Sequence, residues 1–236
     1  MAILTDIPFE LDFAALSRQL HVEPDTEDAG ELAELIEKAR AIGRPKAVYK
    51  ECYIEERGDD TVTIDGITFS SRVLRTNLAE VERVFPHVAT CGEELDGIAL
   101  PDGDFIQRFW LDAIKATLLR FSTRYLNAHL DRKYALGKTA VMSPGSGDVT
   151  VWPIEQQTHL FALLGDVKDR IGVELTESFL MVPNKSVSGI RFPTEIAFRS
   201  CQLCHRQPCP SRAAPFDKEL WETIGDGFEP ETVHRH

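Results

Sequence analysis

The chain has 236 residues, 43% of them hydrophobic and 27% charged, which is enough for one or two domains with a buried core. Its formal net charge of −12 argues against a general nucleic-acid binder and against docking on anionic lipid. No apolar run approaches the ~18 residues of a membrane helix, and the acidic N-terminus lacks the basic start of a secretory signal. We therefore expect a cytoplasmic protein that binds neither nucleic acid nor membrane.

The first hundred residues predict short helices alternating with short strands. Apolar side chains recur at helical spacing in some segments and alternate as in a strand in others. Helices are expected over residues 13–20, 26–41 and 74–84, and strands over 46–56, 61–64, 67–69 and 88–91. Two isolated cysteines, Cys52 and Cys91, lie in these strand patterns and are expected to be small buried hydrophobic residues.

The longest helical pattern runs from Asp104 to about Lys133, without an internal glycine or proline. Its apolar positions form a broad face, which is typical of a central helix packed against a sheet. These positions are Phe105, Phe109, Leu111, Ile114, Leu118, Phe121, Tyr125 and Leu126. The fold class that we predict is α+β, with a mixed or antiparallel sheet packed with helices that include this long one.

A tight loop of small residues follows the long helix. Proline fixes one backbone angle, and glycine adopts conformations closed to other residues, so the backbone N–H groups of such a loop can approach a ligand. The candidate ligand-binding residues are Ser143, Pro144, Gly145, Ser146, Gly147 and Asp148. The alternative is an ordinary tight turn. A phosphate-binding loop is disfavoured because no lysine follows in the Walker arrangement.

Beyond the loop the pattern predicts a helix and then a hairpin. Pro153 suits the first turn of the helix and Gly165 its end, while Trp152 is expected to pack in the core. A strand is expected over residues 175–183, a turn at 184–185 and a returning strand over 186–192. Three further candidate ligand-binding residues lie on these strands: Glu177, Ser186 and Ser188. Structural hydrogen bonds are the alternative role for each.

A second chemical feature is the spacing of Cys201, Cys204 and Cys209, which form a C-x2-C-x4-C pattern. The first spacing lets two thiolates converge on one metal ion, and the second lets a loop bring in the third. Candidates for a fourth ligand are His205, Cys91, Cys52 or a non-protein group. Three readings stay open: an iron–sulfur cluster, a zinc ion, or reduced thiols without metal.

Three segments resemble the activation (reactivation) domain of cobalamin-dependent methionine synthase. They are Ser143-Pro144-Gly145, the sequence GVELTESF at 172–179, and SVSG at 186–189. The sequence VATCGEEL at 88–95 also resembles stand-alone relatives of that domain. The resemblance implies an α+β fold. It also implies a loop that binds S-adenosylmethionine beside the corrinoid, since the family does so with a Pro-Gly-Tyr loop preceded by an arginine.

Two positions depart from the family pattern, because the arginine position falls on Val141 and the tyrosine position on Ser146. Arginine can bind a carboxylate through two parallel hydrogen bonds, and valine cannot. Two hypotheses therefore remain: the chain binds S-adenosylmethionine weakly, or it does not bind this methyl donor at all.

The resemblance implies a stand-alone component of a methionine synthase system. Its partner would be a corrinoid-binding methyltransferase protein that carries cobalamin, and its role would be to support reductive reactivation of cob(II)alamin. The methyl group would come from S-adenosylmethionine. The electron would come from a separate redox partner or from an iron–sulfur cluster on the cysteines.

The alternative is a non-catalytic module, braced by zinc, that docks onto a corrinoid protein. In either case we expect residues 1–199 to form the activation-like domain and residues 200–236 a cysteine-bearing appendix.

Overall fold

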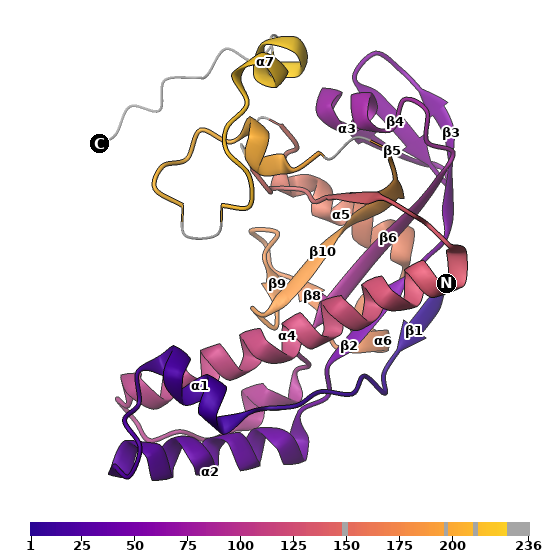
Figure 1. Ribbon diagram of the computed structural model, residues 1–236. Helices are drawn as coiled ribbons and strands as arrows, with labels where there is room; N and C mark the ends of the chain where they lie inside the picture. Colours follow the sequence, from indigo (N-terminus) through magenta and orange to yellow (C-terminus); the bar gives the residue numbers. More distant parts are fainter. Residues whose placement is uncertain (148–150, 196–197, 210–211, 226–236) are drawn as a thin grey trace. The chain divides into compact units, whose positions relative to one another are not determined.

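The computed structural model describes residues 1–147, 151–195, 198–209 and 212–225 (Figure 1). The chain forms two compact units, each assembled from three segments. Unit 1 contains residues 1–49, 87–135 and 164–187; unit 2 contains residues 50–86, 136–163 and 188–236. Helices and antiparallel strand pairs occur together in this fold, so the predicted α+β class is confirmed. The predicted boundary at residue 200, between the activation-like domain and the cysteine-bearing appendix, differs from the boundaries of these units and stays a prediction.

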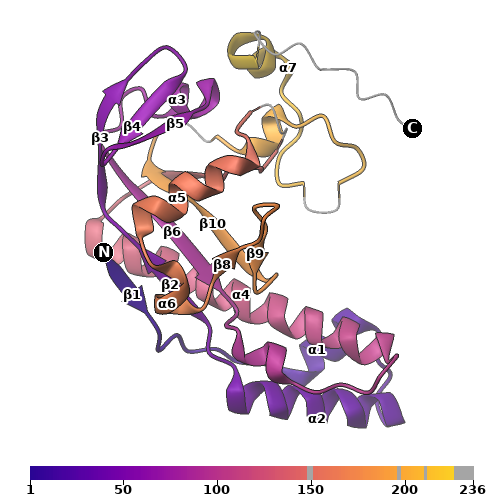
Figure 2. The same ribbon diagram turned by 180° about the vertical axis from the view of Figure 1, so that it is seen from behind.

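Three helices dominate unit 1: α1 (Phe13–Leu20), α2 (Glu27–Ile42) and α4 (Phe105–Tyr134). Each begins after a residue whose side chain accepts a hydrogen bond from the first turn, namely Asp12, Thr26 and Asp104. In both ribbon views α1 and α2 lie beside the first half of α4 (Figures 1 and 2). The core between them is apolar and includes Leu16, Leu32, Ile36, Trp110, Ile114 and Leu118. The predicted long helix is therefore confirmed, and burial of its apolar face holds it in place.

The strands of unit 1 lie at the other end of the same helix. Strand β1 (Ala2–Leu4) pairs antiparallel with β2 (Lys46–Tyr49), and β2 pairs with the second half of β6 (Arg83–Thr90). The buried hydroxyl of Ser122 on α4 donates a hydrogen bond of 2.7 Å to the carbonyl oxygen of Lys46 on β2. Shorter elements of this unit are the 3-10 turn Glu94–Gly97, α6 (Val167–Ile171) and the strand pair β8 (Glu174–Leu175) and β9 (Met181–Val182). The helix α4 is thus fixed to both the helical and the sheet part of unit 1.

Unit 2 is built on the predicted meander. It contains β3 (Cys52–Arg57), β4 (Thr61–Ile64) and β5 (Ile67–Ser70), which pair antiparallel in that order, and the short helix α3 (Arg72–Asn77). The pair β7 (Thr139–Met142) and β10 (Ser186–Pro193) follows, with β10 crossing from unit 1 into unit 2 at Ser188. The remaining elements are the 3-10 turns Ile154–Gln156 and Ser200–Leu203, α5 (Gln157–Leu164), α7 (Lys218–Leu220) and the π-helical turn Trp221–Gly225.

Four sequence predictions about element bounds and burial are wrong. Residues 46–56 do not form one strand, because β2 ends at Tyr49 and β3 begins at Cys52. Residues 74–84 do not form one helix, because α3 ends at Asn77 and β6 begins at Arg83. Residues 175–183 do not form one strand, since a turn separates β8 from β9. Phe105 and Phe109 are 78% and 61% exposed, although the helical pattern placed them on the buried face. Both residues lie in the first turns of α4, where the helical pattern of apolar residues continues but no other described element covers their side chains.

The two isolated cysteines are fully buried, as predicted. Burial raises the pKa of Cys52 to about 12, assisted by a hydrogen bond with Asp65, and burial raises the pKa of Cys91 to about 11. Both thiols therefore stay protonated in the folded chain at a pH where the unfolded chain has begun to lose those protons.

We predict that the free energy of unfolding is insensitive to these thiols below about pH 8 and falls above it, since an ordinary thiol has a pKa of about 8.5. The unfolded chain then releases protons that the folded chain retains, which costs about 2 kcal/mol per thiol by pH 10. Urea titrations at pH 8, 9 and 10 measure this loss. Cys52→Ala should show a smaller loss than the parent protein, because it removes one of the two thiols whose pKa is raised by burial. Equal slopes for Cys52→Ala and the parent would contradict the assignment.

Candidate functional site

The predicted loop is a tight turn in unit 2 whose glycines are required by its backbone. Gly145 and Gly147 have φ angles of 74° and 93°, in the left-handed region that favours glycine. The Gly145 N–H donates to the carbonyl oxygen of Trp152 at 2.8 Å, and the Ser146 N–H donates to that of Ser143 at 3.1 Å. These two N–H groups thus close the turn on itself. Pro144 is buried, while Ser146 and Gly147 are exposed. Asp148 lies outside the described residues.

Close packing leaves no room for side chains at these two glycines. A Cβ atom at Gly145 would lie 2.9 Å from the side chain of Ile154, and one at Gly147 would lie 3.0 Å from the carbonyl oxygen of Ser200. The second contact is informative, because Ser200 immediately precedes Cys201. Within unit 2 the fold therefore brings the predicted loop against the start of the cysteine segment.

The loop is anchored by the side-chain amide of Gln156. Its Oε1 accepts hydrogen bonds from the backbone N–H of Ser70 (2.9 Å) and from the indole Nε1 of Trp152 (3.1 Å), and its Nε2 donates to the carbonyl oxygen of Ser70 (2.6 Å). Nearby, the Ser71 hydroxyl donates to the carbonyl oxygen of Val151 at 2.6 Å. Trp152 is 1% exposed and its ring meets that of Phe69 edge to face. The predicted core role of Trp152 is confirmed.

Ser186 and Ser188 lie at the start of β10, and both hydroxyls are buried. In unit 1 the Ser186 hydroxyl donates to Thr90 Oγ1 (2.9 Å) and to the carbonyl oxygen of Pro183 (2.8 Å). In unit 2 the Ser188 hydroxyl donates to Gln157 Oε1 at 2.7 Å. Because side chains alternate along a strand, Val187 faces the opposite way and is 36% exposed. Contact of the two hydroxyls with a ligand stays a prediction.

The backbone of Ser188 also meets the loop. Its carbonyl oxygen accepts a hydrogen bond of 2.6 Å from the hydroxyl of Ser143. A Cβ atom at the neighbouring Gly189 would lie 2.8 Å from both the carbonyl oxygen of Met142 and the Ser143 hydroxyl. The structure therefore brings together two predicted site residues, Ser143 and Ser188, in unit 2.

Glu177 is exposed and lies in the turn between β8 and β9, not in a strand. The Thr176 side chain causes this difference. Its hydroxyl accepts a hydrogen bond from the Leu180 N–H at 3.1 Å, while the backbone N–H of Thr176 donates to the carbonyl oxygen of Leu180 at 2.8 Å. The turn also contains Phe179 with a φ angle of 62°. Because Glu177 is exposed, its carboxylate needs no buried partner, whereas a place on the inner face of a strand would have required one.

Val141, which occupies the family's arginine position, lies on β7 opposite Arg191 of β10 and is 39% exposed. The Arg191 side chain is 6% exposed, and its Nε and Nη2 donate to the Thr139 hydroxyl at 3.0 Å and 2.9 Å. The guanidinium of Arg191 thus reaches along the ladder to Thr139, which pairs with Pro193.

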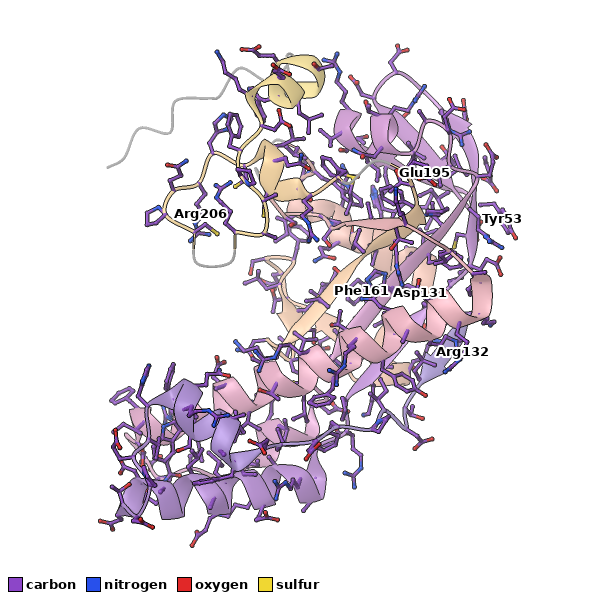
Figure 3. The ribbon with its side chains drawn as sticks, viewed as in Figure 1. Tyr53, Asp131, Arg132, Phe161, Glu195 and Arg206 are labelled. Atoms are coloured by element: carbon purple, nitrogen blue, oxygen red, sulfur yellow. The ribbon has the colours of Figure 1, made fainter. Side chains whose placement is uncertain are left out.

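The backbone of the cysteine segment folds around the side chain of Arg212, which sequence analysis can only place near the thiols as a positive charge. Arg212 Nη1 donates to the carbonyl oxygens of Cys201 (3.1 Å) and Ala214 (3.3 Å), and Nη2 donates to those of Cys204 (3.1 Å) and Arg206 (2.6 Å). Figure 3 shows Arg206 on the loop that this guanidinium holds. A planar fork with several donors suits such a role. No sequence pattern indicates it, because these carbonyls belong to the backbone.

Cys201, Cys204 and Cys209 are half-buried free thiols. The Ala213 N–H donates to the sulfur of Cys201 at 3.4 Å. The ring of His205 packs against those of Phe216 and Trp221, each with centroids 4.4 Å away. Within the part of the chain that the structure describes, no three His, Cys, Asp or Glu side chains are placed to hold a metal ion together. The predicted metal site is not shown.

The comparisons with known proteins bear on the loop and the strand that follows it. Residues 135–199 match the family model of the vitamin B12-dependent methionine synthase activation domain. The match includes the loop, the β8–β9 turn and the SVSG strand, and the three cysteines lie beyond it. No match was found among curated proteins.

The fold agrees with that family. The structure is similar to the one described as "Crystal Structure of the MetH Reactivation Domain bound to AdoHcy", with a TM-score of 0.56 at 16% sequence identity, covering 81% of this chain and 70% of that one. The resemblance seen in the sequence is thereby confirmed at the level of fold. No helix among the described residues is long and apolar enough to cross a membrane.

We predict that Gly145→Ala lowers the free energy of unfolding more than Gly137→Ala. Both glycines have positive φ angles, of 74° and 67°, so each substitution costs about 1 kcal/mol in backbone strain. A methyl group at Gly145 also meets Ile154, whereas nothing lies within 4 Å of one at Gly137. Overpacking adds about 1–3 kcal/mol. Urea denaturation measures the difference, and equal losses for the two variants would show that the loop is loosely packed.

Proposed function

We propose that this protein supports the reductive reactivation of a corrinoid-dependent methyltransferase, as a component that docks on the corrinoid-bearing protein. The observation that carries the proposal is the family match over residues 135–199. It covers the loop at Ser143, the β8–β9 turn and the start of β10, and the structure joins the first and last of these through the Ser143–Ser188 hydrogen bond. That the protein acts as a stand-alone chain remains part of the proposal.

The chemistry that this role requires is an electron followed by a methyl group. One electron reduces cob(II)alamin to cob(I)alamin, and the cobalt then takes the methyl group of S-adenosylmethionine. The sulfonium keeps the electron pair of the broken carbon–sulfur bond, so the second product is S-adenosylhomocysteine. The electron comes from a redox partner. The contribution of this chain is to hold the methyl donor and to exclude water around the reacting atoms.

Exposed apolar side chains in unit 1 support a docking role. Leu180, Val182 and Val187 are 57%, 43% and 36% exposed, and they lie at or beside the segments that match the family. Apolar side chains left in water beside a candidate site are typical of a surface that a partner covers. The negative formal charge of the chain favours a partner with a complementary basic patch.

For the cysteine segment we propose a metal-binding role, as an iron–sulfur cluster or a zinc site. The support is the C-x2-C-x4-C spacing and the ordering of the loop backbone by Arg212. Thiolates are the appropriate donors for either metal. Among the described residues, no three such ligands are placed to hold a metal ion together. We therefore keep the reactivation role above independent of this second proposal. A zinc-braced docking module without chemistry of its own is the other candidate function.

The reactivation proposal predicts methyl transfer. A corrinoid protein in the cob(II)alamin state, a chemical reductant and S-adenosylmethionine labelled in its methyl group are mixed anaerobically, with and without this protein. We expect the protein to accelerate the formation of methylcobalamin at least tenfold. The variant Gly147→Val, whose side chain meets Ser200, should lose most of this effect, and Gly137→Ala should keep it. An unchanged rate with the parent protein would favour the docking module.

Metal content separates the two metal hypotheses. We expect protein purified without oxygen to contain either iron and sulfide or zinc, and Cys204→Ala to lose that metal, because it removes one of the three thiolates. Elemental analysis and an electron paramagnetic resonance spectrum after reduction measure this. Thr158→Ala, at an exposed position outside the cysteine segment, serves as the control and should keep the metal. A metal-free parent protein would leave the thiols with a structural role only.

A further inference from the structure

The first two turns of α4 carry an exposed apolar patch. Among the described residues, the three most exposed large apolar side chains are Phe105, Phe109 and Ile106, at 78%, 61% and 58%. Residues four apart lie on one face of an α-helix, and Ile106 flanks the face that the two phenylalanines share, so the three side chains form one patch. Together they expose roughly 400 Å² of apolar surface. A contiguous apolar patch of that size is typical of an interaction site.

The net negative charge of the chain is concentrated in two ranges of unit 1. Residues 23–37 and 93–107, here called the acidic segments, contain seven and five acidic residues and no lysine or arginine. These twelve account for the whole formal net charge of −12, because the rest of the chain has 26 charged residues of each sign. Six of the twelve carboxylates are exposed and form no ion pair within the described part of the chain: Glu23, Asp25, Glu27, Asp28, Glu34 and Asp102.

The fold brings the acidic segments and the apolar patch to the same end of unit 1. The side-chain amide of Gln107 in the first turn of α4 donates a hydrogen bond of 2.9 Å to the carboxylate of Glu31 on α2. In both ribbon views α2 and α4 begin at the same end of the helical part of this unit (Figures 1 and 2). The second acidic segment includes Phe105 and Ile106. The patch is therefore part of the most acidic region of the chain.

This charge decides which partner fits the patch. A second copy of the chain would bring two strongly negative regions together, and like charges at close range repel. Anionic lipid is disfavoured for the same reason. A basic protein segment is attracted, since exposed charges act over a Debye length of about 8 Å at physiological ionic strength. An amphipathic helix with lysine or arginine on one face can neutralise the carboxylates while its apolar face covers the phenylalanines.

We propose that the apolar patch and the acidic segments form a docking surface for a basic amphipathic helix of a partner protein. Phe105 and Phe109 are its anchors, because aromatic side chains dominate the centres of protein interfaces. The patch is about half the ~800 Å² that each partner buries in a stable interface, so the complex is transient. The inference goes beyond the reactivation role and does not depend on it, since it uses neither the loop at Ser143 nor the cysteine segment.

Binding of a designed peptide to the full chain tests the proposal. The probe is a fluorescent peptide of ~18 residues that contains only leucine and lysine, with leucine at helical spacing along one face. Fluorescence anisotropy should give a Kd in the micromolar range that weakens about tenfold between 50 and 300 mM salt. The same peptide with glutamate in place of lysine should bind at least about thirtyfold more weakly, because its charge repels the acidic segments.

Two matched pairs of variants locate the binding surface. Phe109→Gln should weaken binding of the basic peptide about tenfold, as loss of an aromatic anchor does. Tyr53→Gln is its control, at an aromatic residue of unit 2 that is 53% exposed (Figure 3), and should change the Kd less than about twofold. Asp102→Asn should weaken binding about threefold, whereas Asp59→Asn, at an exposed carboxylate of unit 2, should not. Circular dichroism should show that all four variants fold.

Three results would overturn the proposal. They are a parent protein that does not bind the basic peptide, equal losses within either pair of variants, and sedimentation of the parent as a dimer that Phe109→Gln dissociates. The last result would assign the patch to a second copy of the chain. Because the peptide assay contains neither cobalamin nor a methyl donor, each of these results leaves the methyl-transfer assay to decide the reactivation role separately.

Discussion

The side-chain amide of Gln156 is the interaction on which the candidate loop depends. It pairs with both backbone groups of Ser70 and also receives the indole N–H of Trp152, so one amide joins the end of β5 to the segment that closes the loop. A buried amide that loses its hydrogen-bond partners destabilises a protein by about 1–3 kcal/mol. Conformations of the loop that break these hydrogen bonds are therefore disfavoured. Trp152 then accepts the Gly145 N–H through its carbonyl oxygen, which fixes the turn. The loop is therefore anchored to the core of unit 2 through Gly145, while Ser146 and Gly147 are exposed.

The sequence predicted this part of the fold only in outline. Gly145 and Gly147 were recognisable because few residues other than glycine tolerate the backbone angles that they adopt. Ser70, which pairs with Gln156 through both of its backbone groups, lies 86 residues away, and nothing in a glutamine indicates this partner. Glu177 was assigned to a strand because alternation was read through Thr176, whose hydroxyl instead closes a turn. The role of Arg212 in ordering the cysteine segment was not predictable, because the groups it binds are backbone carbonyls, which carry no sequence signal.

The candidate site in unit 2 combines elements that the family match covers with one feature outside it. This feature is the cysteine segment, which begins against Gly147 and is ordered by Arg212. Loss of the family's arginine at Val141, taken alone, argues against a methyl donor. The function thus depends on how the chain departs from its family as well as on what it shares.

Hydrogen–deuterium exchange on this protein, with and without a cobalamin-loaded corrinoid protein, tests the central claim of docking most directly. The proposed function predicts slower exchange at residues 141–147 and 181–189 when the partner is present, and no change in the β3–β4 meander. Cobalamin-free partner protein is the control and should protect these segments less. Protection confined to the meander, or identical exchange in all samples, would contradict the account.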